Sequence, residues 1–390
     1  MHSVFEFLIA LASILFFAKI FGEIALKLRQ SAIIGELLAG VFIGHSILGI
    51  IHETPILTSI SEVGAVILLF EAGLSTDIKE FLKVGGWATS VAFIGVIVPY
   101  FFGYLVFLYF GLSSAQAIFA GAVLTATSVG ITARIFTDLK KLETKEAKIV
   151  LGAAVIDDVI GLAILAVVLK LVQGGTVTFR TVASVSGSAV LFLVLSVAAG
   201  TLIAPTLFKF ISKMKQKHII LVMGIVFCFA VSAFATKVGL ASIVGSFIAG
   251  LILSTTNQSE EIKRDVKPIY SFFVPMFFVL MGTNVNISVF NFFVAVNREI
   301  LILIAVLFVV AFTTKVVAGF AVLKKGINKL LIGVSMVPRG EVGLIFAEVG
   351  FKNNVFNSNE YSALIAVIIL TTFITPVVLK CLLLKQNENG

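Results

Sequence analysis

Long runs of apolar residues dominate the chain, and short segments containing charged residues, Gly or Pro separate them. A helix needs roughly 20 apolar residues to cross a bilayer core about 30 Å thick. The chain is 59% apolar and 13% charged, and its mean hydropathy of +1.12 excludes an ordinary soluble domain. The pattern therefore predicts an all-α, polytopic membrane protein. We expect thirteen transmembrane helices, near residues 4–26, 32–50, 57–75, 86–110, 114–137, 146–171, 181–208, 218–236, 239–256, 268–285, 299–323, 328–350 and 361–384.

Positive charge is distributed unevenly between the loops of this predicted topology. Of the 29 Lys and Arg residues, 20 lie in loops on one side of the membrane and 5 on the other. Short loops rich in Lys and Arg stay in the cytoplasm. We therefore expect the N-terminus outside and the C-terminus in the cytoplasm. This distribution also accounts for the net charge of +8 without a nucleic-acid partner.

Three pairs of segments indicate an internal repeat. IIGELLAG at 33–40 resembles IVGSFIAG at 243–250, GLSTDI at 73–78 resembles GTNVNI at 282–287, and TATSVG at 125–130 aligns with SMVPRG at 335–340. The offset is 209 or 210 residues each time, and matching spans are seven apart. Because seven is odd, the two copies cross the membrane in opposite directions. The expected repeats cover about 1–172 and 218–385, with a linker helix at about 181–208, and such inverted repeats are typical of secondary transporters.

Two of the matching spans contain residues that interrupt helices. The fifth span carries Thr125, Thr127 and Ser128 before a glycine, and the twelfth carries Pro338 and Gly340. Proline removes a backbone donor and glycine weakens a helix, so unwound backbone can offer carbonyl groups to a cation. The alternative is that the hydroxyl groups bond back to their own helix and that glycine only allows close packing.

Charged residues inside the spans are the strongest functional signal. Asp157 and Asp158 are adjacent in an apolar run, although each charge at the bilayer centre costs roughly 2.5–3.5 kcal/mol on insertion scales. Lys315 lies deep in the eleventh span, and one of the two aspartates is its expected partner. Arg339 and Glu341 flank the second interruption and are expected to pair with each other or with polar groups across the bundle. A purely structural role for these charges is the alternative.

Five further charged residues lie in or near spans, and the sequence assigns none of them to a substrate. They are Lys19, Glu23, Glu36, Glu71 and Arg134.

The candidate ligands are carboxylates, hydroxyl groups and backbone carbonyls, which suit a small hard cation. A carboxylate exposed alternately to each side of the membrane can bind a cation and a proton in turn. We therefore expect a transporter, not an enzyme, with no bound cofactor. A solute symporter needs a larger polar cavity, and a channel needs a ring of equivalent pore residues. An intramembrane aspartyl protease needs its two aspartates on facing helices.

The motifs AAVIDDVIGL, LTATSVGITARIF and VSMVPRGEVGLIF, together with Lys315, resemble the bacterial Na+/H+ antiporters of the second monovalent cation/proton antiporter family. The resemblance covers essentially the whole chain. It implies the sodium/proton antiporter fold, with two crossed interrupted helices. It also implies a homodimer in the bacterial cytoplasmic membrane, with a mobile core at about 57–172 and 268–385 and the remaining helices forming a dimerisation domain.

The same resemblance assigns roles to the charged residues. It implies that Asp158 binds Na+ or Li+, that Asp157 pairs with Lys315, and that exchange for protons is electrogenic and uses an elevator-type motion. K+/H+ exchange by the same family remains open at this point, because ion selectivity depends on details of site geometry.

Overall fold

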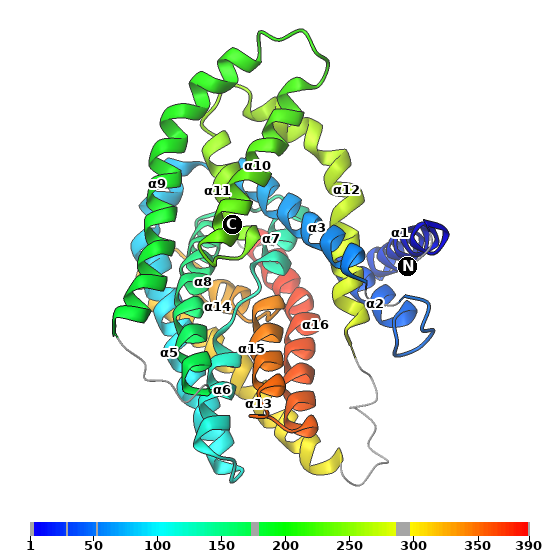
Figure 1. Ribbon diagram of the computed structural model, residues 1–390, viewed down its shortest axis with the longest axis vertical. Helices are drawn as coiled ribbons and strands as arrows, with labels where there is room; N and C mark the ends of the chain where they lie inside the picture. Colours follow the sequence, from blue (N-terminus) through cyan, green and yellow to red (C-terminus); the bar gives the residue numbers. More distant parts are fainter. Residues whose placement is uncertain (1–3, 29, 52–53, 173–178, 286–296, 389–390) are drawn as a thin grey trace.

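The computed structural model describes residues 4–28, 30–51, 54–172, 179–285 and 297–388, and every regular element in these ranges is helical (Figure 1). The continuous helices are α1 (Val4–Lys27), α2 (Ala32–Ile43), α3 (Pro55–Leu74), α4 (Ile78–Lys83), α5 (Gly85–Tyr109), α8 (Lys145–Val172), α9 (Phe179–Ile211), α10 (Ile219–Lys237), α11 (Ser242–Leu253), α12 (Ser259–Thr283), α13 (Asn297–Ala318) and α16 (Ser358–Glu388). A short 3₁₀ turn, η2 (Gly319–Ala321), follows α13.

The remaining two spans are each divided into two helices. The first divided span consists of α6 (Ser114–Thr125) and α7 (Val129–Asp138), and the second of α14 (Lys329–Ser335) and α15 (Glu341–Lys352). Both interruptions fall where the hydroxyl-rich segment and the Pro-Gly segment predict them. The interrupted helices are therefore a confirmed feature of the fold.

Ten helical spans in the described residues are long and apolar enough to cross a membrane, counting α6 and α7 as one. The expected second and ninth spans are shorter than their apolar runs. Helices α2 and α11 have 12 residues each, or about 18 Å at 1.5 Å per residue. After α2, residues 44–51 form a bend and a turn instead of continuing the helix. The helix expected over 32–50 is therefore wrong in its length, and the count of thirteen spans stays a prediction.

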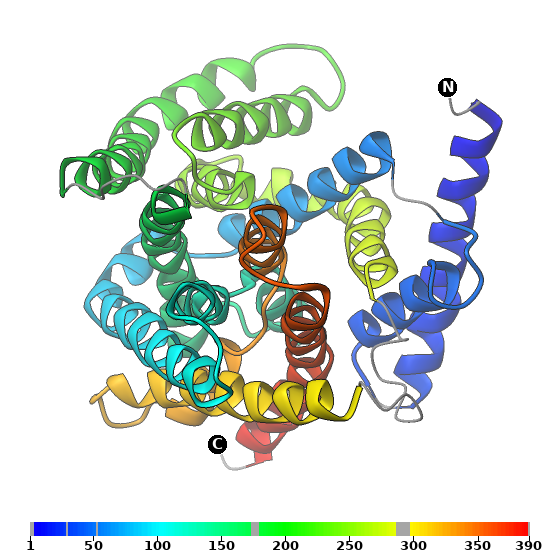
Figure 2. The ribbon, with the colours of Figure 1, turned by 60° about the horizontal axis from the view of Figure 1, so that its bottom comes forward.

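The helices pack in two groups (Figures 1 and 2). Helices α1, α2, α3, α10, α11 and α12 contact one another, and so do α5 to α8 with α13 to α16. We call the first group the frame and the second the core. Helix α9 packs along α8 and α11 and exposes much of its apolar surface.

Two crossings inside the frame bring backbone against backbone. A methyl group added at Gly40 of α2 would lie 2.8 Å from the Cα of Gly282 in α12. One added at Gly73 of α3 would lie 3.0 Å from the Cα of Gly250 in α11. Only glycine permits these approaches, because a side chain at any of the four positions would hold the helices apart.

Candidate functional site

The two helix interruptions contact each other in the middle of the core. The backbone N–H of Ser128 donates to the carbonyl of Pro338 over 2.7 Å. The hydroxyl group of Thr132 donates to the carbonyl of Ser335, also over 2.7 Å. These bonds satisfy polar backbone groups that an interrupted helix would otherwise leave unpaired inside a membrane.

Gly340 makes this contact possible. A Cβ atom at position 340 would lie 2.6 Å from the Oγ of Ser128 and 2.8 Å from its Cβ. The Pro338 carbonyl supplies the acceptor, while Gly340 supplies the space. The two predicted residue types therefore serve different parts of one junction.

Two buried cations cover the C-terminal end of α6. Lys315 donates to the carbonyl of Thr125 and to the hydroxyl oxygen of Thr127, both over 2.6 Å. Arg339 donates to the carbonyl of Leu124 over 2.8 Å. Both side chains are fully buried. A helix ends with unpaired carbonyls and partial negative charge, so two cations there stabilise the interrupted helix.

Arg339 also donates to the carbonyls of Ala311 in α13 and Val337, over 3.1 and 3.0 Å. It thus fixes α6, α13 and the second interruption to one another. The sequence left two partners open for Arg339, namely Glu341 or polar groups across the bundle. The hydrogen bonds that Arg339 donates to Leu124 and Ala311 go to polar groups across the bundle. Glu341 begins α15, and its side chain lies outside the described residues.

Asp157 of α8 is also buried, and it lies beside Lys315. Its Oδ2 is 3.5 Å from the Nζ of Lys315, and the residue is 4% exposed. The pairing that the sequence left open between the two aspartates is therefore with Asp157. Lys315 shares its donors between this carboxylate and the end of α6.

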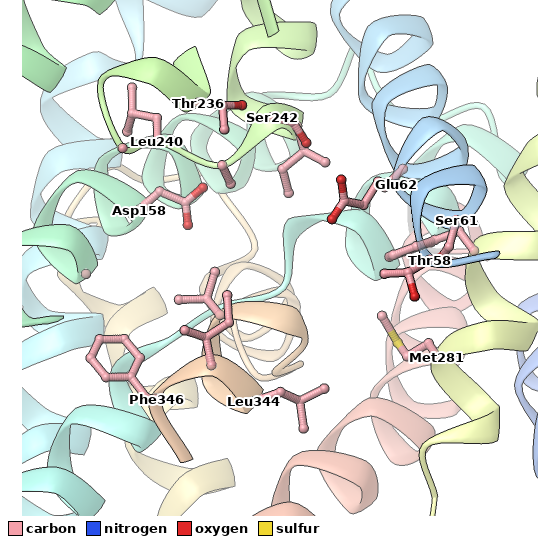
Figure 3. Close-up of a pocket in the computed structure, with 18 of the residues that line it drawn as sticks. Thr58, Ser61, Glu62, Asp158, Thr236, Leu240, Ser242, Met281, Leu344 and Phe346 are labelled. Carbon is pink, nitrogen blue, oxygen red and sulfur yellow. The ribbon is translucent and has the colours of Figure 1, made fainter. Parts of the chain in front are cut away.

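Asp158 points in another direction, because adjacent helix positions are about 100° apart. It lines a cavity of about 470 Å³ between core helices α8 and α15 and frame helices α3, α10, α11 and α12. Figure 3 shows the Asp158 carboxylate on one side of this cavity and Glu62 on the other. The other polar residues that line it include Thr58, Ser61, Thr236, Ser242 and Asn284. Among the described residues that line it, none is Lys or Arg.

The sequence reasoning missed Glu62 as a cavity residue. The available signal was a carboxylate within the expected third span. What the sequence lacked was the contact between spans three and six, which places Glu62 and Asp158 on the same cavity.

A charged cluster lies at the opposite end of the frame helices. Arg134 of α7 contacts Glu36 of α2 at 3.7 Å and Asp138 of its own helix at 3.0 Å. Its guanidinium also lies 4.9 Å from the ring centre of Tyr270 in α12. Beside it, the hydroxyl group of Thr137 lies 3.4 Å from the carboxylate of Glu71 in α3. The sequence gave these residues no role, and we call Glu36, Glu71, Arg134, Asp138 and Tyr270 the charged cluster.

Fold and site together define a membrane transport protein with two interrupted helices and buried carboxylates. Comparison with known families agrees, because residues 12–385 match the transmembrane sodium/hydrogen exchanger family. The chain therefore belongs to that family.

Several proteins are similar in sequence to this chain over nearly its whole length. The high-affinity Na+/H+ antiporter NhaS3 of Synechocystis is 38% identical, over 95% of this chain and 88% of that protein. The Na+/H+ antiporter of Enterococcus hirae is 32% identical, over 98% and 100%. The Na+/H+-K+ antiporter GerN of Bacillus cereus is 33% identical, over 96% of both. These relatives are transporters, which agrees with the expectation of transport instead of catalysis.

The fold is also similar to a solved structure. The sodium proton antiporter MjNhaP1 of Methanocaldococcus jannaschii aligns with a TM-score of 0.62 over 96% of each chain, at 18% identity. The chain is a multi-pass membrane protein with this fold, and Na+/H+ exchange is the activity for which its relatives are named.

Proposed function

We propose that the protein exchanges cytoplasmic Na+ or Li+ for external protons, electrogenically and by an elevator-type motion of the core. One observation carries this proposal. Asp158 lines a cavity whose described lining residues include no Lys or Arg, whereas its neighbour Asp157 is buried against Lys315. A carboxylate in contact with a cavity can bind a cation and a proton alternately, and the hydroxyl oxygens that line the same cavity suit a hard cation.

The paired residues account for a second charge. In this proposal Lys315 stays protonated while it faces Asp157, and it releases its proton when Na+ binding at Asp158 draws Asp157 away. Asp158 gives up one proton to bind Na+ and Lys315 gives up the other, so two protons move against one Na+ and each cycle carries net charge. The contacts of Lys315 with Thr125 and Thr127 give the lysine polar partners throughout.

The inverted repeat gains support from the frame crossings. The offsets of 210 and 209 residues that align the two halves match Gly40 with Gly250 and Gly73 with Gly282. The contact between Gly40 and Gly282 therefore corresponds to the contact between Gly250 and Gly73. Two halves related in this way can exchange conformations, which opens the site to the other side of the membrane. By the predicted orientation, the cavity opens outward.

The packing favours a narrower mobile body than the sequence division of 57–172 and 268–385. Helix α3 packs on α11 and α12, and α12 packs on α2 and α3. We therefore propose that the core of α5 to α8 and α13 to α16 moves against a frame that includes α3 and α12. A homodimer in the bacterial cytoplasmic membrane, formed through the frame, and membership of the second monovalent cation/proton antiporter family are parts of the same proposal.

Purified protein in liposomes with an internal pH dye tests the proposed function. Jumps of Na+, Li+ or K+ are imposed with the membrane potential either clamped or free. We expect proton movement with Na+ and Li+ that depends on the potential. Absence of proton movement with every cation, from folded protein, contradicts the proposal.

K+/H+ exchange is the second candidate, and the name of the GerN relative includes K+. An equal response to K+ in the same assay would favour it. The NhaS3 and Enterococcus hirae relatives are named for Na+ alone, which favours the first candidate.

A further inference from the structure

The charged cluster joins the core to the frame on the side away from the cavity. Thr58 of the cavity and Glu71 of the cluster lie near opposite ends of α3, and Tyr270 of the cluster precedes Asn284, which caps the C-terminal end of α12, by 14 residues or about 21 Å. Arg134 belongs to a core helix, while Glu36, Glu71 and Tyr270 all belong to frame helices. Any opening on this side must separate Arg134 from Glu36.

The repeat relates three residues of this cluster to residues that line the cavity. With the same offsets, the residues of the other half that correspond to Arg134, Glu71 and Tyr270 are Leu344, Leu280 and Ser61, respectively. Leu344, Leu280 and Ser61 all line the cavity. The closed side and the open side are therefore equivalent regions of the two halves.

The chemistry of the two regions nevertheless differs. Glu36 corresponds to Ser246 in the second half. When the cavity side closes, the residue at the position of Arg134 is Leu344, which can form only apolar contacts with the frame. The side with the cluster closes with an ion pair at the same position.

From this difference we propose that Arg134 and Glu36 form an ionic latch that holds shut the side of the protein opposite the cavity, with no counterpart on the cavity side. The inference rests on the proposed alternating mechanism. The latch stabilises the conformation in which Asp158 faces the cavity. In the opposite conformation, the position of Arg134 is occupied by Leu344, which offers the frame no ion pair.

Asp138 explains how the latch can open. It lies one turn after Arg134 on α7 and contacts it at 3.0 Å. Both residues move with the core, so Arg134 keeps a carboxylate partner after it leaves Glu36. A buried cation without a partner would make opening too costly.

The test measures how fast a cysteine in the cavity reacts with a membrane-impermeant maleimide, without an ion gradient. Ser61→Cys is introduced into a chain with Cys228→Ala and Cys381→Ser. Removing the latch with Arg134→Leu/Glu36→Gln should shift the protein away from the cavity-open state and slow labelling by about fivefold. Arg134→Lys keeps the charge and should restore much of the rate.

A second variant moves the latch chemistry to the other side and leaves the charged cluster intact. Leu344→Arg/Ser246→Glu should hold the cavity side closed and also slow labelling. Arg264→Leu removes an exposed ion pair with Asp265 on α12 and serves as the matched control, with no expected change. Folding of each variant is checked by its elution as a single species in detergent.

Unchanged or faster labelling in the Arg134→Leu/Glu36→Gln protein contradicts the latch. Unchanged labelling in the Leu344→Arg/Ser246→Glu protein contradicts the equivalence of the two sides. Labelling needs no transport, so these results remain readable even if the proteoliposome assay contradicts Na+/H+ exchange.

Discussion

Asp157 and Asp158 are consecutive residues of α8, yet their surroundings differ. Asp157 is buried beside Lys315, whose amine also covers the end of α6. Asp158 lines a cavity that Glu62 and several hydroxyl groups share. The 100° turn between adjacent helix positions is enough to place one carboxylate beside Lys315 and the other at the cavity. Position on the helix, more than residue type, separates the two roles.

Removing the carboxylate at the cavity should have the largest effect. Asp158→Asn keeps the size of the side chain but cannot carry the charge that a cation or proton neutralises. We expect exchange to fall to the background of empty liposomes, as measured with the pH dye after a Na+ jump. Glu23→Gln, which removes an exposed carboxylate on α1 that does not line the cavity, is the matched control and should retain exchange. Full activity in Asp158→Asn would show that the ion binds elsewhere.

Changing the partner of Asp157 should alter the charge carried and leave turnover largely intact. Lys315→Gln removes the second titrating group but retains a hydrogen-bond donor toward the end of α6. We expect Na+-driven proton movement to continue but to become insensitive to the membrane potential. Parallel measurements of dye signal and of transient current on a supported membrane separate the two quantities. An unchanged current per exchanged Na+ would exclude Lys315 from proton transfer.

The contact between the two interruptions should affect stability more than ion choice. Gly340→Ala places a methyl group against Ser128, which forces the interruptions apart at a cost of about 1–3 kcal/mol. A lower thermal unfolding temperature is expected, together with weaker exchange. Gly187→Ala on α9, where nothing lies within 4 Å, is the control and should not destabilise the protein. Equal unfolding temperatures for both variants would contradict the packing argument.

A third aspartate, outside the membrane, gives the smallest effect and a baseline for the other two. Asp77 caps α4, and the backbone amide groups of Glu80 and Lys79 hold its pKa below the ordinary value. Its contribution to stability is therefore complete above the ordinary aspartate pKa and is lost as pH falls through the lowered pKa. Asp77→Ala should cost about 1 kcal/mol at neutral pH.

Thermal unfolding of Asp77→Ala near pH 7 and below pH 3 checks this pH dependence. The difference from the unmodified protein should shrink at the lower pH, while exchange activity at neutral pH stays unchanged. A difference that grows as pH falls would contradict the capping role.

Much of this arrangement could be predicted from the sequence because the membrane imposes simple rules. Apolar runs predicted the long helices, Pro338 and Gly340 predicted an interruption, and Lys315 required an acidic partner. The lengths of α2 and α11 could not be predicted, because apolar residues form turns as well as helices in this environment. The partners of Arg339 were also inaccessible, since backbone carbonyls carry no sequence signal. The latch joins two helices, α2 and α7, that are distant in the sequence, and only the fold brings Arg134 to Glu36.

The glycine crossings of the frame have a consequence for how motion in this protein can be measured. At Gly40 with Gly282, and at Gly73 with Gly250, main chain meets main chain. No change of side-chain rotamer can lengthen or shorten such a crossing, because no side chain lies between the two backbones, so we expect α2, α3, α11 and α12 to move together. Spectroscopic labels on these four helices therefore provide a reference from which any displacement of Asp158 in the proposed motion can be measured in ångströms.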